Sequence, residues 1–247
     1  MEMLLVYGVV AFAWVVGGLI GGSTGIGAIM VAMPIMSTVL TPSEAVLVSC
    51  LTGLFGSMQL SWAYWRFCSW KDIRELVAGG IPGCILGVLV LRVASMQTLQ
   101  LMVCAMLVCF LTMQFFRKTA SWRLSDSAIT GVIAGVICGF VSGSVAMMGA
   151  PLGIYVLLKH WSPDSARGNM SIFYVFIGVM SVISQAVAGL YTFSLLPLAL
   201  AGIIGCAIGQ ITGVKIGRRI NQQLFYKIVL VFLSVAAIML FVRAVGE

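Results

Sequence analysis

The chain has 247 residues, of which 61% are hydrophobic and 9% charged, and its formal net charge is +7. A soluble domain carries about 25% charged residues, so this composition, with a mean hydropathy of +1.13, excludes a soluble protein and predicts an all-α polytopic membrane protein. The basic residues lie in short loops between apolar runs, where membrane orientation accounts for them, and no nucleic-acid partner is expected.

The first apolar run covers residues 3–20 and has no Lys or Arg before it. Without a basic leader or a small-residue cleavage site, it predicts an uncleaved membrane helix rather than a signal peptide. The stretch "GGSTGIG", residues 21–27, follows with four glycines and no charge. Glycine costs about 1 kcal/mol relative to alanine inside a helix, so these glycines predict a break before the next run, 26–40.

Three further apolar runs complete the first half of the chain: 45–65, 76–94 and 97–116. A helix needs about 20 residues to cross a hydrocarbon core of about 30 Å. The run 26–40 is shorter than that, so the sequence leaves open whether it crosses the membrane or forms a re-entrant hairpin with 3–20.

The second half repeats the order of the first. "GGSTGIGAIMVAMPIM", "TPSEA" and "GCILG" correspond to "CGFVSGSVAMMGAPLG", "SPDSA" and "GCAIG". The matched positions are Gly22 with Gly139, Pro34 with Pro151, Pro42 with Pro163, Ala45 with Ala166, and Cys84 with Cys206. The second set of apolar runs is 127–141, 145–159, 166–189, 194–214 and 224–243. We therefore expect two transmembrane repeats, 1–117 and 127–247, joined by a cytoplasmic linker, 118–126.

The positions of Lys and Arg decide how the repeats are oriented. Five segments per copy is an odd number and requires inverted repeats, whereas four spans per copy would make the copies parallel. With the N-terminus outside, nearly all basic residues fall in inside loops and only Arg92 and Arg243 lie outside, as the positive-inside rule requires. The parallel arrangement places "KIGRR" and the uncharged "LYTF" on the wrong sides. We expect 8 to 10 helices in the cell inner (plasma) membrane, with 26–40 and 145–159 short or re-entrant.

The glycine breaks predict a binding site. A Gly-interrupted segment in the corresponding place of each inverted repeat points to a transporter site near the bilayer midplane. A broken helix leaves free N–H groups and a positive dipole end, which attract an anion. Hydroxyl groups at the breaks and a proline downstream of each support this reading; they belong to Ser23, Thr24, Ser142, Ser144, Pro34 and Pro151. The alternative is close helix packing, in which small residues are also common.

A second set of glycines favours packing. Spacing of four residues lines one helix face with backbone that a neighbouring helix can approach. These glycines are Gly79, Gly83 and Gly87 in the first copy and Gly205, Gly209, Gly213 and Gly217 in the second. They could serve a homodimer as well as the monomer, so oligomeric state is left open.

Acidic residues lie only at segment ends or in loops, which favours an anionic over a cationic substrate. Proton coupling is left open; the substrate, Glu44 or His160 would then carry the proton. No C-x-x-C pair, metal-ligand cluster, nucleotide-binding motif or catalytic triad is present, so we expect no metal, no cofactor and no enzymatic activity.

The quoted motifs, together with "TPSEAVLVSCLTGLF" and "SGSVAMMGAPLGIYVLLKHWSPDSARGNMSIF", resemble the sulfite exporter TauE/SafE family over nearly the whole chain. The resemblance implies transport of sulfur-containing anions such as sulfite, sulfonates and sulfoacetate-like compounds. It also implies a substrate site in each half. The first comprises Gly22, Ser23, Thr24, Gly25, Gly27, Pro34, Ser49 and Thr52, and the second Ser142, Gly143, Ser144, Gly149, Pro151, Asn169 and Ser171.

The second break departs from the family pattern, because Ala146, Met147 and Met148 replace part of its glycine-rich motif. This substitution suggests a bulkier or less polar ligand. The resulting hypothesis is a secondary exporter of small organosulfur anions that works by alternating access between inverted repeats. The alternatives are a passive anion channel and an uptake carrier for a carboxylate or sulfur compound; substrate, direction and coupling ion are left open.

Overall fold

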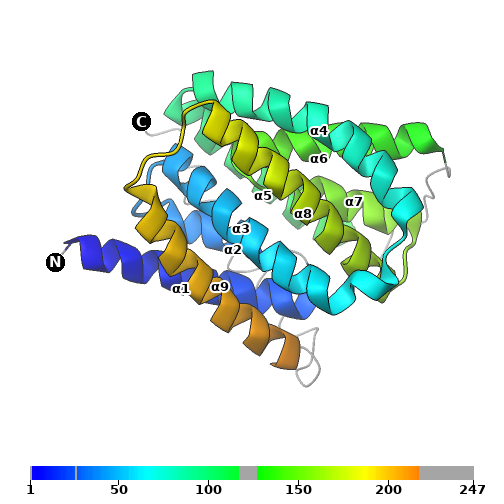
Figure 1. Cartoon of the computed structure of the whole chain (residues 1–247), viewed down its shortest axis with the longest axis horizontal. Helices are drawn as coiled ribbons and strands as arrows, with labels where there is room; N and C mark the ends of the chain where they lie inside the picture. Colours follow the sequence, from blue (N-terminus) through cyan, green and yellow to red (C-terminus); the bar gives the residue numbers. More distant parts are fainter. Residues whose placement is uncertain (1, 26, 117–126, 217–247) are drawn as a thin grey trace.

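The computed structural model describes residues 2–25, 27–116 and 127–216, and these ranges form helices without any strand. In chain order the elements, drawn in Figure 1, are α1 (Glu2–Thr24), α2 (Ala28–Met36), α3 (Pro42–Tyr64), the 3-10 turn η1 (Trp65–Phe67), α4 (Trp70–Val93), α5 (Met96–Phe116), α6 (Ala128–Val145), α7 (Gly149–Lys159), α8 (Pro163–Val187) and α9 (Leu195–Ile216). The linker 118–126 and the expected segment 224–243 lie outside the described residues.

Six of these helices are long and apolar enough to cross a membrane: α1, α3, α4, α6, α8 and α9. This confirms the expected polytopic, all-helical class. The helices α2 and α7 have only 9 and 11 residues. At about 1.5 Å per residue each is far shorter than a hydrocarbon core of about 30 Å.

The two Pro-containing turns start the two central helices. Thr41 and Glu44 form a capping box at the beginning of α3: Thr41 Oγ1 accepts from the Glu44 N–H at 3.4 Å, and the Glu44 carboxylate accepts from the Thr41 N–H at 3.0 Å. Ser162 caps α8 by accepting from the Ser165 N–H at 3.3 Å. Each cap satisfies backbone donors that the first helical turn leaves free.

Glycines bring two pairs of helices into backbone contact. A Cβ atom on Gly83 would overlap the carbonyl oxygen of Val136, so α4 lies directly against α6. A Cβ atom on Gly209 would overlap the carbonyl oxygen of Val15 in the same way, between α9 and α1. The other described members of the four-residue glycine series make equivalent contacts. Their prediction as packing residues is confirmed; Gly217 lies outside the described residues.

The order of these contacts gives the helix directions. Gly205, Gly209 and Gly213 meet Ala11, Val15 and Leu19 in turn, so α1 and α9 are parallel. The glycines of α4 meet successively later residues of α6, so this pair is parallel as well. In contrast, α3 and α8 are antiparallel, since Gly178 lies beside Leu54, whereas Gly168, ten residues earlier, lies beside Tyr64.

The bundle therefore has two ends. One end carries Arg66, Lys71, Arg74 and Lys159 and is called the basic end. There α3, α7 and α9 finish and α4, α6 and α8 begin; at the opposite, α8–α9 end, residues 188–194 connect α8 to α9. The hairpin of α1 and α2 enters from the α8–α9 end and returns to it (Figure 1). The hairpin of α6 and α7 enters from the basic end and returns there.

Candidate functional site

Left-handed backbone ends the first helix of each hairpin. Gly25 and Gly27 have φ values of 81° and 95° between α1 and α2. Ala146, which follows α6, has a φ value of 60°. Glycine takes this conformation without strain, whereas for alanine it costs about 1–2 kcal/mol. The second break is thus held in its conformation by the packing around it.

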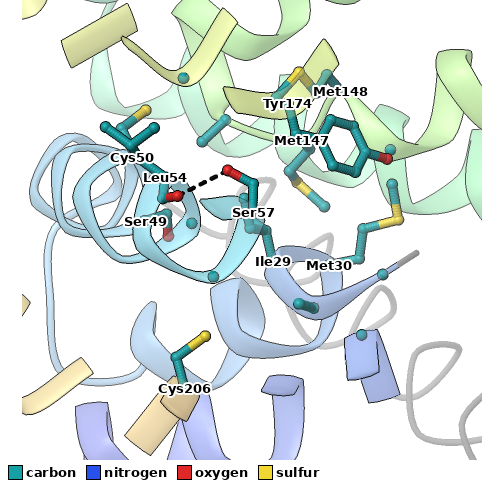
Figure 2. Close-up of a pocket in the computed structure, with 18 of the residues that line it drawn as sticks. Ile29, Met30, Ser49, Cys50, Leu54, Ser57, Met147, Met148, Tyr174 and Cys206 are labelled. Carbon is teal, nitrogen blue, oxygen red and sulfur yellow. Dashed lines mark hydrogen bonds between the residues drawn. The ribbon is translucent and has the colours of Figure 1, made fainter. Parts of the chain in front are cut away.

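The two breaks border one cavity. The cavity has a volume of about 80 Å³, several times the roughly 10–15 Å³ that one water molecule needs. Figure 2 shows that Ser49, Cys50, Leu54 and Ser57 reach it from α3, where the Ser57 hydroxyl donates to the Leu54 carbonyl oxygen at 2.8 Å. The lining residues come from both breaks, with Gly25 and Gly27 in the first and residues 146–148 in the second, and from α1, α2, α3, α6, α7, α8 and α9.

The N-termini of α2 and α7 lie at this cavity. Gly27 and Gly149 line it, and the first bonds of the two helices run from Val31 N to Gly27 O and from Leu152 N to Met148 O, each at 3.2 Å. Neither helix has a side-chain cap, in contrast to α3, α6 and α8. The amides of the first turn of each short helix are therefore uncapped donors, and the helix dipole adds about half a positive charge at each end.

Two side-chain donors at the cavity also lack acceptors. Trp14 and Tyr174 line the cavity, and Trp14 Nε1 and the Tyr174 hydroxyl are buried and have no hydrogen-bond partner among the described residues. A buried donor without a partner costs about 1–3 kcal/mol, and such a group in a native fold calls for an explanation. An acceptor that reached these atoms from the cavity would supply one, because an indole N–H can only donate.

No charged side chain is among the described residues that line the cavity. The guanidinium of Arg167 lies just outside, at the basic end: its stem passes Gly25, and its Nη2 is 3.5 Å from the Ser23 carbonyl oxygen. It also lies 3.6 Å from the Asp164 carboxylate and 5.6 Å from the centre of the Tyr64 ring. These contacts are long, so they hold the guanidinium only weakly.

Some of the residues expected at the substrate site line the cavity. They are Gly25, Gly27, Ser49, Ser142 and Gly149. Ser142 also forms a hydrogen bond of 3.0 Å with Ser181 on α8, and Ser49 Oγ lies 3.8 Å from the Met33 sulfur. The cavity thus receives residues from both predicted halves of the site.

Two expected glycines lie instead between helices. A Cβ atom on Gly22 would come within 2.5 Å of the Gln210 carbonyl oxygen on α9. One on Gly143 would overlap the Cys84 carbonyl oxygen on α4. Neither glycine lines the cavity, so their contacts are those of helix packing.

The expected hydroxyl residues outside the cavity are mostly bonded within their own helices. Ser23, Ser144 and Ser171 donate to the carbonyl oxygens of Ile20, Phe140 and Gly168 at 3.0, 2.8 and 3.0 Å. Thr52 is buried against α9, where a Cβ atom on Gly202 would lie 2.6 Å from its Oγ1. The side chain of Thr24 lies outside the described residues.

The remaining expected residues have structural contacts. Asn169 is buried, and its Oδ1 accepts from the Ser69 N–H at 2.6 Å, which joins α8 to the start of α4. Pro34 is buried inside α2, and Pro151 lies in the first turn of α7, where its missing N–H breaks no helical bond.

Sequence reasoning missed several cavity residues, among them Trp14, Ser57, Tyr174 and Gln210. A glutamine within an apolar span is itself a signal, because polar side chains in membrane helices commonly mark functional positions. Trp14 and Tyr174 carry no comparable signal, since aromatic residues are also ordinary core residues of apolar helices.

The family model for the sulfite exporter TauE/SafE matches residues 10–240. Comparison with curated proteins and with solved structures gave no match.

Proposed function

Since the chain belongs to the sulfite exporter TauE/SafE family, we propose that it is a secondary transporter that exports small organosulfur anions. Sulfite, sulfonates and sulfoacetate-like compounds are the substrates that this proposal names. The anion binds in the cavity between the two hairpin breaks, and the protein supplies binding and access rather than chemistry.

The observation that carries the proposal is the donor set of the cavity. The uncapped first turns of α2 and α7 and the unpartnered groups of Trp14 and Tyr174 all offer N–H or O–H donors. A hydrogen bond to a charged group contributes about 1.5–3 kcal/mol, so a few neutral donors suffice to bind an anion. Without a fixed cation the anion also leaves readily, as transport requires.

The packing of the helices supports two inverted repeats. The first helix of each expected copy lies against the fourth helix of the other: α1 against α9, and α6 against α4. The hairpins enter from opposite ends, and the equivalent helices α3 and α8 pack against each other. In this proposal α2 and α7 are the re-entrant segments, and rocking of one repeat against the other gives alternating access.

The charge distribution supports an inner-membrane protein with its N-terminus outside. Basic residues near the ends of the described helices, including Arg66, Lys71, Arg74, Lys159 and Lys215, gather at the basic end. The α8–α9 end, where α1 begins, has Arg92. By the positive-inside rule the basic end is cytoplasmic.

The test is uptake of radiolabelled sulfite by proteoliposomes that contain the full chain. We expect saturable flux and exchange of labelled for unlabelled anion, since a carrier shows both. Trp14→Phe removes one cavity donor, and we expect it to lower the flux at limiting substrate about tenfold or more. The matched control is Trp62→Phe, because Trp62 is 87% exposed and is not among the residues that line the cavity.

Two results would change the assignment. Flux that rises without saturation and shows no exchange would make the protein a channel. Equal flux in Trp14→Phe and Trp62→Phe, with both proteins folded, would show that the cavity is not on the transport path.

A further inference from the structure

Polar residues continue from the cavity along one face of α8. Tyr174, Gly178, Ser181 and Gln185 recur at spacings of four, three and four residues, which places them on one side of the helix. Tyr174 and Gly178 line the cavity, and Ser181 and Gln185 follow it toward the α8–α9 end. Both of these side chains are fully buried.

Hydrogen bonds join this face to the cavity and to the end of the bundle. Ser181 Oγ lies 3.0 Å from the Ser142 hydroxyl. Gln185 Nε2 donates to the Cys50 sulfur at 3.3 Å, and the Tyr191 hydroxyl donates to Gln185 Oε1 at 2.7 Å. Ser142 and Cys50 line the cavity, whereas Tyr191 lies in the 188–194 connection. We call these five residues the α8 track.

Two polar side chains of the track, Gln185 and Ser181, each have a cysteine sulfur as one of their partners. A thiol sulfur is a poor acceptor for an amide N–H, so an anionic oxygen that replaced Cys50 beside Gln185 would form a stronger hydrogen bond. Ser181 likewise has the Cys84 sulfur at 3.1 Å as its second partner. Neutral polar side chains in membrane bundles commonly form hydrogen bonds between helices, and a row of them that begins at the cavity also offers an anion successive hydrogen-bond partners.

Tyr191 is placed to close the track. It is half-buried, and burial raises the pKa of its hydroxyl above the usual range, with a smaller contribution from Cys50. The hydroxyl therefore keeps its proton and remains a donor to Gln185. Its 2.7 Å bond is the shortest in the track and lies on the side away from the cavity.

We propose that the α8 track is the path of the anion between the cavity and the α8–α9 end, and that the hydrogen bond between Tyr191 and Gln185 closes it in this conformation. The proposal rests on the proposed function and adds the route and its gate. It assigns transport roles to Ser181, Gln185 and Tyr191, none of which lines the cavity.

The native thiol of Cys50 reports on the gate. We would keep Cys50 as the single cysteine, with serine at Cys84 and alanine at the other cysteines, and label it with a membrane-impermeant methanethiosulfonate that carries a sulfonate group. The reagent is applied to vesicles of each orientation. We expect Tyr191→Phe to raise the labelling rate about fivefold from the α8–α9 side alone, the effect of losing about 1 kcal/mol of one hydrogen bond.

One variant controls the labelling measurement, and a second variant tests the track by sulfite flux. Tyr64→Phe makes the same chemical change at the basic end and leaves the rate unchanged from the α8–α9 side. Gln185→Leu keeps the volume but removes the polar group, and we expect it to lower sulfite flux at least tenfold while the protein still unfolds cooperatively. An unchanged labelling rate in Tyr191→Phe, an increase from the basic side, or full flux in Gln185→Leu would overturn the track.

Protection of Cys50 by sulfoacetate separates this proposal from the one on which it rests; sulfoacetate is used because sulfite itself reacts with methanethiosulfonates and cleaves the disulfide that they form. Sulfite flux and protection in the parent protein, with no effect of Tyr191→Phe, would reject the gate and retain the transporter. Absence of both flux and protection would reject the transporter itself, and the track with it.

Discussion

Replacing Tyr174 by phenylalanine removes a single oxygen atom from a side chain that lines the cavity. That oxygen is buried and has no partner among the described residues, and the ring packs in the apolar cluster around Phe173 and Met148. The substitution leaves this packing in place. Its effects on the empty protein and on the complex with an anion should therefore have opposite signs.

The magnitudes follow from the hydrogen bond that the hydroxyl lacks. In the empty protein, an unsatisfied buried hydroxyl costs about 1–3 kcal/mol, so Tyr174→Phe should raise the free energy of unfolding by up to that amount. In the complex, the hydroxyl donates to a charged ligand, and loss of about 1.5–3 kcal/mol raises Kd about 10- to 150-fold.

Two measurements on purified protein test both signs. Thermal unfolding without ligand reports stability, and calorimetric titration with sulfite reports Kd. Tyr7→Phe is the matched control, since Tyr7 lies in α1 away from the cavity lining and should change neither quantity. If Tyr174→Phe is less stable than the parent without ligand and binds sulfite as tightly, the hydroxyl does not donate a hydrogen bond to a bound anion, and the reasoning is refuted.

Two other substitutions separate packing and joining residues from the cavity. Gly83→Ala should lower the free energy of unfolding by about 1–3 kcal/mol, because its Cβ would meet the Val136 carbonyl oxygen. The control is Gly8→Ala, which has nothing within 4 Å and should be neutral or stabilising. Equal thermal unfolding of the two variants would contradict the close contact of α4 and α6. Asn169→Ala leaves the Ser69 N–H without its acceptor and should lower the free energy of unfolding by about 1–3 kcal/mol without changing the Kd for sulfite. A large rise in Kd would instead indicate that Asn169 belongs to the substrate site.

Local patterns in the sequence are sufficient to predict the helices. Apolar length, glycine clusters and the two Pro-containing turns predicted where helices start and stop, because capping and backbone strain act within a few residues. The sequence also predicts Gly83 and Gly209 as packing residues, because a spacing of four places small residues on one face of a helix.

The sequence was less informative about which side of a helix faces the cavity. Gly22 and Gly25 belong to the same glycine cluster, yet Gly22 contacts α9 and Gly25 lines the cavity. Ser142 and Ser144 likewise differ, because the first reaches the cavity and the second bonds to its own helix. Neighbouring residues in a helix point about 100° apart. A motif whose residues are all assigned to the substrate site therefore includes some that line the cavity and some that pack against a helix.

The sequence by itself determined the class of this protein, its broken helices and its family, because hydropathy, glycine content and motif order are properties of short segments. Only the tertiary structure decided that the N-termini of α2 and α7 border one cavity, and that Trp14 and Tyr174, whose donors have no partner among the described residues, line the same cavity. Those contacts join residues far apart in the chain. They depend on the packing of α1 with α9 and of α4 with α6, which no local pattern specifies.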